Sequence, residues 1–330
     1  MLDRAYGALV GGAIGDAMGM PASFLTRRQI TAAYGYIQDF LTPEKDVQSF
    51  HGNLNAGEIT DDTMESVIIS QVLIQHGEFS EEAFNAAMKK WAIEQKMLES
   101  TVIGPSTRRY LTALIEGTDP KLTAGRGVTN GSAMRAAPIG IRYHHDVSKC
   151  IEAAAASSLP SHGSKPAVAA ACAVAAGVAL GVHGGHTPRD ILRAAADAAV
   201  YGEKVGAEVT APSVAQRLKL VETIVDQAKG ADISAILDEL VAIFGASMMA
   251  YESVAIAFGS FYATGGHGAN GVLAAVNAGD DADTNGSICG NLCGAYSGAS
   301  AFPTSWCKRI EANSGLKLKD TAYALLTLCS

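Results

Sequence analysis

The chain has 330 residues, of which 48% are hydrophobic and 18% are charged, and this composition is typical of a globular protein with a large buried core. A formal net charge of −8, with no long basic run, argues against a general nucleic-acid surface, because such surfaces neutralise phosphates with Lys and Arg. Asp3 and Asp16 interrupt the apolar N-terminus and no basic segment precedes it, so it does not read as a secretory leader.

Helical periodicity recurs along the chain, and no sustained alternation of the kind that strands require is present. The pattern predicts helices, in chain order, at residues 2–18, 62–76, 81–95, 106–117, 132–139, 148–158, 166–182, 188–200, 211–228, 233–240, 254–262, 269–278 and 285–299. The segments between them are rich in Gly, Pro, Asn and Asp, and none resembles a linker. We therefore predict an all-α protein with one domain, residues 1–330.

The run at residues 166–182, PAVAAACAVAAGVALGV, is shorter than the ~20 residues that span a bilayer and consists mostly of weakly hydrophobic Ala and Gly. It predicts a central helix buried on all sides, and we expect no membrane partner. With no leader, the cysteines are interpreted as reduced thiols of a cytoplasmic protein. They are Cys150, Cys172, Cys289, Cys293, Cys307 and Cys329.

Two glycine ladders stand out from this background. Glycine recurs every four residues in each, at Gly7, Gly11, Gly15 and Gly19, and at Gly286, Gly290, Gly294 and Gly298. This spacing places a stripe without side chains on one helix face. Each interior glycine costs about 0.5–1 kcal/mol relative to Ala, so close helix–helix contact is the expected compensation.

Two acidic clusters are placed where helices are predicted to begin. Residues 57–63 read GEITDDT and precede an apolar helical pattern, and residues 277–286 read NAGDDADTNG and precede the second ladder. Asp and Thr are good N-caps, and the helix dipole favours carboxylates in a first turn, so capping alone is one interpretation. The other is a cation site: the clusters hold five Asp and three Thr, more than capping needs, and hard oxygen ligands favour Mg²⁺ or Mn²⁺.

Several segments in order resemble the ADP-ribosylglycohydrolase family, which includes crystallin J1-like proteins. Residues 60–62 (TDD) and 281–284 (DADT) are similar to its two metal motifs. Residues 7–17 resemble its opening helix, 130–140 (NGSAMRAAPIG) its NGxxMR segment, and 161–163 (SHG) its histidine turn. The resemblance extends along the whole chain.

This resemblance implies a single-domain orthogonal helical bundle with a central binuclear metal cleft for two Mg²⁺ ions, with Mn²⁺ as an alternative. The implied metal ligands are Thr60, Asp61, Asp62, Asp281, Asp283 and Thr284. Asp62, Asp281 and Asp283 are the candidate catalytic carboxylates. The candidate substrate contacts are Gly127, Asn130, Gly131 and Ser132, in a Gly-rich segment before a predicted helix, and His162.

Two segments depart from the family pattern. Many members carry Glu in a Pro-x-Glu-Phe stretch after the first helix, whereas this chain has Ser23 at that position. Residues 104–109 (GPSTRR) resemble a subgroup whose members need not act on ADP-ribosylated proteins. The aglycone is therefore the open point of the assignment.

Three functions remain as hypotheses. The first is a magnesium-dependent hydrolase that cleaves the bond at the anomeric carbon of ribose in an ADP-ribosyl conjugate. The second is a nucleoside-type N-ribohydrolase that acts on a small riboside, favoured by the missing Glu because a smaller substrate needs less gating. The third is a catalytically silent protein that binds ligands like ADP-ribose, against which the complete set of metal-motif residues argues.

Overall fold

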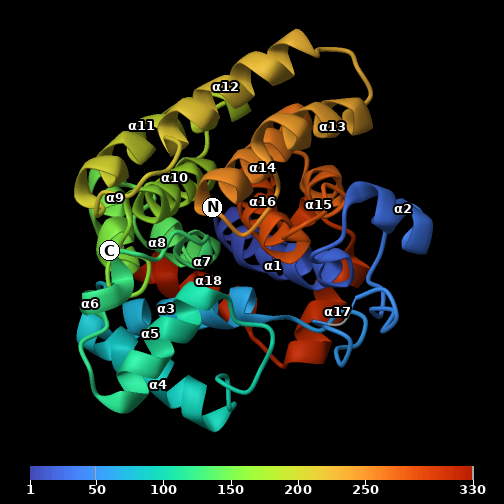
Figure 1. Cartoon of the computed structure of the whole chain (residues 1–330). Helices are drawn as coiled ribbons and strands as arrows, with labels where there is room; N and C mark the ends of the chain where they lie inside the picture. Colours follow the sequence, from blue (N-terminus) through green and yellow to red (C-terminus); the bar gives the residue numbers. More distant parts are fainter. Residues whose placement is uncertain (49, 329–330) are drawn as a thin grey trace.

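The computed structural model describes residues 1–48 and 50–328, so Cys329 lies outside the described residues. Within them the chain forms helices and three isolated β-bridges, with no extended strand, which confirms the all-α prediction (Figure 1). The helices are α1 (Leu2–Gly19), η1 (Met20–Ala22), α2 (Arg27–Tyr34), α3 (Asp61–His76), α4 (Glu81–Glu94), α5 (Pro105–Glu116), α6 (Lys121–Ala124), α7 (Gly131–Met134), α8 (Ala137–Arg142), α9 (Val147–Ser158), α10 (Lys165–His183), α11 (Pro188–Val205), α12 (Val214–Gln227), α13 (Ile233–Phe244), α14 (Ala250–Ala263), α15 (Gly268–Val276), α16 (Ala282–Ser297), η2 (Ala299–Ala301), α17 (Thr304–Ser314) and α18 (Leu318–Thr327).

The structure corrects the predicted helices in two respects. The helix predicted at 132–139 is wrong: α7 ends at Met134 and α8 begins at Ala137. Pro138 is the reason, because it has no N–H to donate to the carbonyl of Met134 and its ring clashes with that carbonyl. Helices α2, α6, α17 and α18 were not predicted: α6 has only four residues, and each of the other three buries only one to three.

The glycine ladders face each other in the central pair of helices, α1 and α16 (Figure 1). A Cβ added to Gly286 would lie 2.6 Å from the carbonyl oxygen of Gly15, and one added to Gly19 would lie 2.6 Å from the Cα of Asp283. This confirms the predicted close contact. It also brings the end of α1 against the start of α16, where the second acidic cluster lies.

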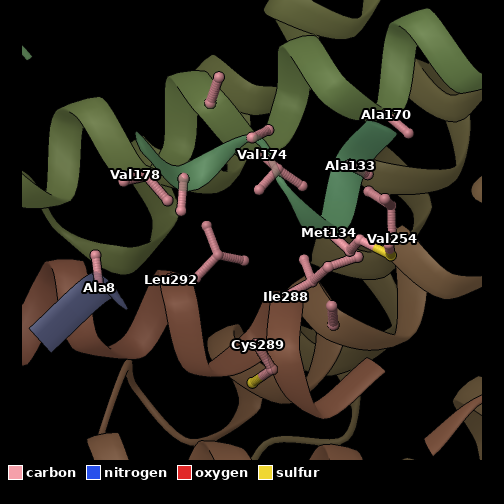
Figure 2. Packing of buried hydrophobic residues seen from close by; sticks show 14 of the residues in the cluster. Ala8, Ala133, Met134, Ala170, Val174, Val178, Val254, Ile288, Cys289 and Leu292 are labelled. Carbon is pink, nitrogen blue, oxygen red and sulfur yellow. The ribbon is translucent and has the colours of Figure 1, made fainter. Parts of the chain in front are cut away.

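Helix α10 packs against α16 in the core of the protein. Figure 2 shows Val174 and Val178 of α10 pointing toward Ile288 and Leu292 of α16. Of the described helices, α10 alone is long and apolar enough to cross a membrane, and 89% of its most apolar window is buried inside the protein. That burial is typical of a core helix, as predicted for residues 166–182.

Candidate functional site

The starts of α3 and α16 line one cavity with a volume of about 190 Å³. Seven of the predicted site residues are in its wall: Asp61, Asp62, Asn130, Gly131, Asp281, Asp283 and Thr284. The two clusters also touch directly, because the Thr284 hydroxyl donates to Asp62 Oδ2 at 3.3 Å across 222 residues of sequence. Tertiary packing thus joins the two acidic segments into one site.

Asp16 holds the start of α3 in place. Its carboxylate is fully buried on α1 and accepts hydrogen bonds from the backbone N–H groups of Thr60 and Thr63 at 3.0–3.2 Å. It also accepts from the hydroxyls of Thr60 at 2.8 Å and Thr63 at 2.5 Å. Thr60 itself does not line the cavity but lies behind Asp62, with its hydroxyl 3.4 Å from Asp62 Oδ2. Asp16, on the helix that carries the first glycine ladder, thereby positions the first acidic cluster.

Two further side chains hold the carboxylates of the second cluster. Asn130 donates to Asp281 Oδ2 at 2.5 Å. His51 Nε2 lies 3.2 Å from Asp283 Oδ2, at ion-pair distance but without the alignment of a hydrogen bond. Each of these carboxylates therefore has a fixed partner on a loop remote in sequence.

The carboxyl groups differ in their electrostatic state. Burial, reinforced by neighbouring carboxylates, raises the pKa of Asp61, Asp62 and Asp281 well above the usual value. Burial also raises the pKa of Asp283, but the His51 partner outweighs it, with help from Ser23, and the net pKa is lowered. The pKa of His51 shifts in the matching direction: burial lowers it, Asp283 and Asp16 raise it, and the net pKa is raised. The site therefore crowds together acidic groups whose ionised forms repel one another, and a single histidine offsets this repulsion only in part.

Two carboxylate oxygens of the site lack a hydrogen-bond partner among the described residues. They are Asp62 Oδ1 and Asp283 Oδ1, and both are buried. A buried acceptor without a partner costs free energy, so a hard cation fits this donor set. Among the described residues, however, no three His, Cys, Asp or Glu side chains form a ready-made cluster for a metal ion.

The other predicted substrate contacts lie outside the cavity wall. Gly127 packs against the 161–162 turn, where an added Cβ would lie 2.8 Å from the carbonyl oxygen of Ser161. Ser132 donates to the carbonyl of Ala167 at 3.3 Å, and the His162 ring is fully buried beneath Gly131. Because α7 has only four residues, a strong helix dipole at Gly131 is not available to hold phosphate.

Comparison with known proteins identifies the family. The model of the ADP-ribosylglycohydrolase family matches residues 1–330. The chain belongs to the ADP-ribosylglycohydrolase family. Its family places it among the glycosidases, which are hydrolases.

Relatives of this ADP-ribosylglycohydrolase family member align over almost the whole chain. An uncharacterized protein of Archaeoglobus fulgidus is 31% identical, covering 94% of this chain and 92% of its own. The uncharacterized protein YegU of Escherichia coli (strain K12) is 29% identical, over 98% and 96%. The ADP-ribosylarginine hydrolase Tri1 of Pseudomonas putida (strain GB-1) is 26% identical, over 94% and 74%. A solved structure described as an ADP-ribosylglycohydrolase-related protein complex shares the fold, with a TM-score of 0.74, 23% identity, and coverage of 100% of this chain and 99% of that one.

Sequence reasoning assigned no role to two residues that hold the candidate site of this family member together. Asp16 was visible only as a carboxylate inside an apolar glycine ladder, which was itself a signal, because a buried charge in a core helix needs partners. His51 had no local signal, since it lies in a segment without regular structure. Ser23, at the position of the family Glu, is buried and helps to lower the pKa of Asp283. A neutral hydroxyl therefore occupies the place of the carboxylate.

Without divalent cations, the free energy of unfolding is expected to fall as the pH rises from about 4 to about 6. Burial raises the pKa of Asp16 from 3.8 to about 6, and those of Asp61, Asp62 and Asp281 also rise. A carboxyl group with a raised folded-state pKa contributes stability that is full below its unfolded pKa and is lost as the pH rises through the folded value. The pKa values of Glu65 and Asp280 are raised as well, whereas the lowered pKa values of Asp283 and of the exposed Asp190 and Asp226 act in the opposite direction. Exposed pairs contribute little, so the buried groups with raised pKa values decide the sign. Urea unfolding in EDTA at several pH values measures this, and stability that rises over the interval would contradict it.

Proposed function

We propose that this protein hydrolyses the bond at the anomeric carbon of ribose in an ADP-ribosyl conjugate, with Mg²⁺ as its cofactor. The observation that carries the proposal is the meeting of the two acidic helix starts on one cavity, with Thr284 bonded to Asp62. Family membership supports the substrate class, and the name of the Pseudomonas putida relative points to an ADP-ribosylated arginine.

The metal would be held by the cavity-wall residues of both clusters: Asp61, Asp62, Asp281, Asp283 and Thr284. Thr60, the sixth ligand that the resemblance implies, lies behind Asp62 and would have to turn its hydroxyl from Asp16 toward the cavity to join them. The unpartnered oxygens Asp62 Oδ1 and Asp283 Oδ1 support this assignment. A bound cation would offset the mutual repulsion of these carboxylates. Once bound, Mg²⁺ supplies Lewis-acid character and lowers the pKa of water. Mn²⁺ has the same preference for oxygen ligands.

The chain's own residues would then perform three tasks. Asn130 and Gly131 in the cavity wall contact the ribose end of the substrate. Positive charge develops on the ribose ring as the aglycone departs, and the buried carboxylates stabilise it because the surrounding dielectric is low. A carboxylate among Asp62, Asp281 and Asp283 accepts the proton of the attacking water. The Asn130 amide holds Asp281 in its orientation.

Two observations favour a smaller substrate as the second candidate. The cavity volume of about 190 Å³ is below the roughly 300–1,000 Å³ of pockets that enclose drug-sized ligands. Ser23 in place of Glu leaves no carboxylate at that position. Both features suit a nucleoside-type N-ribohydrolase.

A panel assay distinguishes these functions. Purified protein with Mg²⁺, and a parallel sample with EDTA, is incubated with ADP-ribosyl-arginine, ADP-ribosyl-serine and simple nucleosides, and released ADP-ribose or ribose is measured. We expect release from an ADP-ribosyl substrate that depends on Mg²⁺. Release from nucleosides alone would favour the second candidate. No turnover, together with no Mg²⁺ binding by calorimetry, would favour the silent ligand-binding protein.

The cytoplasmic location expected from the sequence stays a prediction.

A further inference from the structure

A chain of hydrogen bonds leads from a buried arginine to the cavity wall. Arg135 is fully buried; its Nη1 lies 2.5 Å from Glu65 Oε2, and its Nη2 donates to Ser161 Oγ at 2.7 Å. Ser161 Oγ lies 2.8 Å from His162 Nδ1, and His162 Nε2 lies 3.2 Å from Thr129 Oγ1. Thr129 lines the cavity, so the chain ends where a substrate would bind.

The direction of every proton in this chain follows from Arg135. A guanidinium group can only donate, so Ser161 Oγ accepts from it, and the Ser161 proton is left to donate to His162 Nδ1. With Nδ1 accepting, the neutral His162 ring carries its proton on Nε2 and donates it to Thr129 Oγ1. In the opposite tautomer Nδ1 would carry the proton, and Ser161 Oγ would accept from both Arg135 and His162. The buried Ser161 hydroxyl proton would then lose Nδ1 as its acceptor, which costs free energy.

Thr129 is oriented from both sides. Its hydroxyl receives the His162 proton and donates its own to Ser106 Oγ at 2.9 Å, and Arg109 Nη2 donates to the same Ser106 oxygen at 3.1 Å. A hydroxyl oxygen has two lone pairs, so one lone pair of Thr129 is left for a bound molecule. Burial, followed by Arg135 and Arg109, holds the pKa of His162 well below its usual value, consistent with a neutral ring.

The His162 ring is also fixed by packing. It lies directly beneath Gly131, where an added Cβ would be 2.7 Å from Nε2. Gly131 belongs to the cavity wall and His162 does not. The ring therefore supports the wall from behind and reaches the cavity only through Thr129.

We propose that His162 is a positioning residue. Arg135, acting through Ser161, holds its ring as the neutral Nε2–H tautomer. The ring in turn orients the Thr129 hydroxyl, so that the free lone pair of this hydroxyl accepts a hydrogen bond from a donor group of the substrate. If the proposed function holds, that donor is a hydroxyl group of the ADP-ribosyl moiety. His162 takes no part in proton transfer to or from the reacting atoms.

The tautomer is measured directly by ¹⁵N NMR of the histidine side chains near neutral pH, with the His162 signals identified by their loss in His162→Gln. We expect a protonated Nε2 and an unprotonated Nδ1 in the unaltered protein; the reverse pattern, or a doubly protonated ring, would overturn the proposal. In Ser161→Ala the two nitrogen signals should move toward each other, because the Nε2–H tautomer loses the donor that favours it and exchange between the two tautomers averages their shifts. Ser158→Ala is the matched control: the Ser158 hydroxyl donates to the backbone oxygen of His162, at 2.8 Å, and not to its ring, so the change should leave the ring signals unchanged.

The consequence for binding is measured with ADP-ribose as the calorimetric probe. Ser161→Ala and Thr129→Val should each weaken its binding roughly three- to tenfold, the equivalent of one hydrogen bond, while Ser158→Ala should not. Unweakened binding in Thr129→Val and Ser161→Ala, despite the changed ring signals, would overturn the positioning role. If ADP-ribose does not bind the unaltered protein at all, the proposed function fails, and the nitrogen signals still decide the tautomer.

Discussion

Asp62→Asn and Asp283→Asn are each expected to lower turnover of an ADP-ribosyl substrate by roughly a thousandfold or more at saturating Mg²⁺. Each change keeps the volume of the side chain but replaces a charged oxygen by an amide. Within residues 1–48 and 50–328 the buried oxygens Asp62 Oδ1 and Asp283 Oδ1 have no partner, so they are available to a cation. Steady-state assays with Mg²⁺ varied over a wide range measure the loss.

Stability separates loss of the site from loss of the fold. In EDTA, Asp62→Asn should be at least as stable as the unaltered protein, because neighbouring carboxylates and burial disfavour the charged form of Asp62. Mg²⁺ at about 100 times its dissociation constant should stabilise the unaltered protein by about 2.7 kcal/mol and the variant by much less. Thermal unfolding with and without Mg²⁺ makes the comparison.

Asp280→Asn is the matched control for these variants. Asp280 belongs to the same acidic cluster but is absent from the cavity wall, and its φ of 54° is a conformation that Asn adopts readily. It should retain activity and its response to Mg²⁺. Substantial activity in both Asp62→Asn and Asp283→Asn would refute the carboxylate mechanism.

The second large effect concerns the glycine contact: Gly15→Ala is expected to destabilise the fold by about 3 kcal/mol. In an ordinary helix the same change is stabilising by about 0.5–1 kcal/mol, so the sign of the effect is itself diagnostic. Here the added Cβ would collide with the backbone of Gly286 and lie 2.7 Å from the Ser287 nitrogen, and backbone atoms of a packed helix cannot rotate away. Urea unfolding of the variant gives the difference in the free energy of unfolding.

Gly104→Ala provides the comparison for this prediction. No atom of the described residues lies within 4 Å of a Cβ added at Gly104, which precedes α5 with φ −69°, so the cost of Gly104→Ala should stay within about 1 kcal/mol. If Gly15→Ala were no more costly than Gly104→Ala, α1 and α16 would not need their close approach. Any separation of these helices should also reduce activity, because Asp16 on α1 holds the start of α3.

Local sequence determined the helices with strong signals and the chemistry of their ends. The buried run at 166–182 and the two ladders predicted a core helix and a close helix pair, because periodicity and the absence of side chains are properties of a single segment. The Asp and Thr residues at 60–62 and 281–284 likewise marked helix starts wherever they came to lie. The break between α7 and α8 also has a local cause, because Pro138 disfavours a continuous helix over residues 132–139.

Only the tertiary structure decided which of these ends meet and what stands between them and the cavity. The contact between Asp62 and Thr284, and that between His51 and Asp283, join segments that no local pattern relates. The same applies to His162, which the histidine motif suggested as a substrate contact, but which packing places behind Gly131. The physical reason is that residue type and spacing fix the donors and acceptors of a segment, whereas burial and partner choice depend on how distant helices pack.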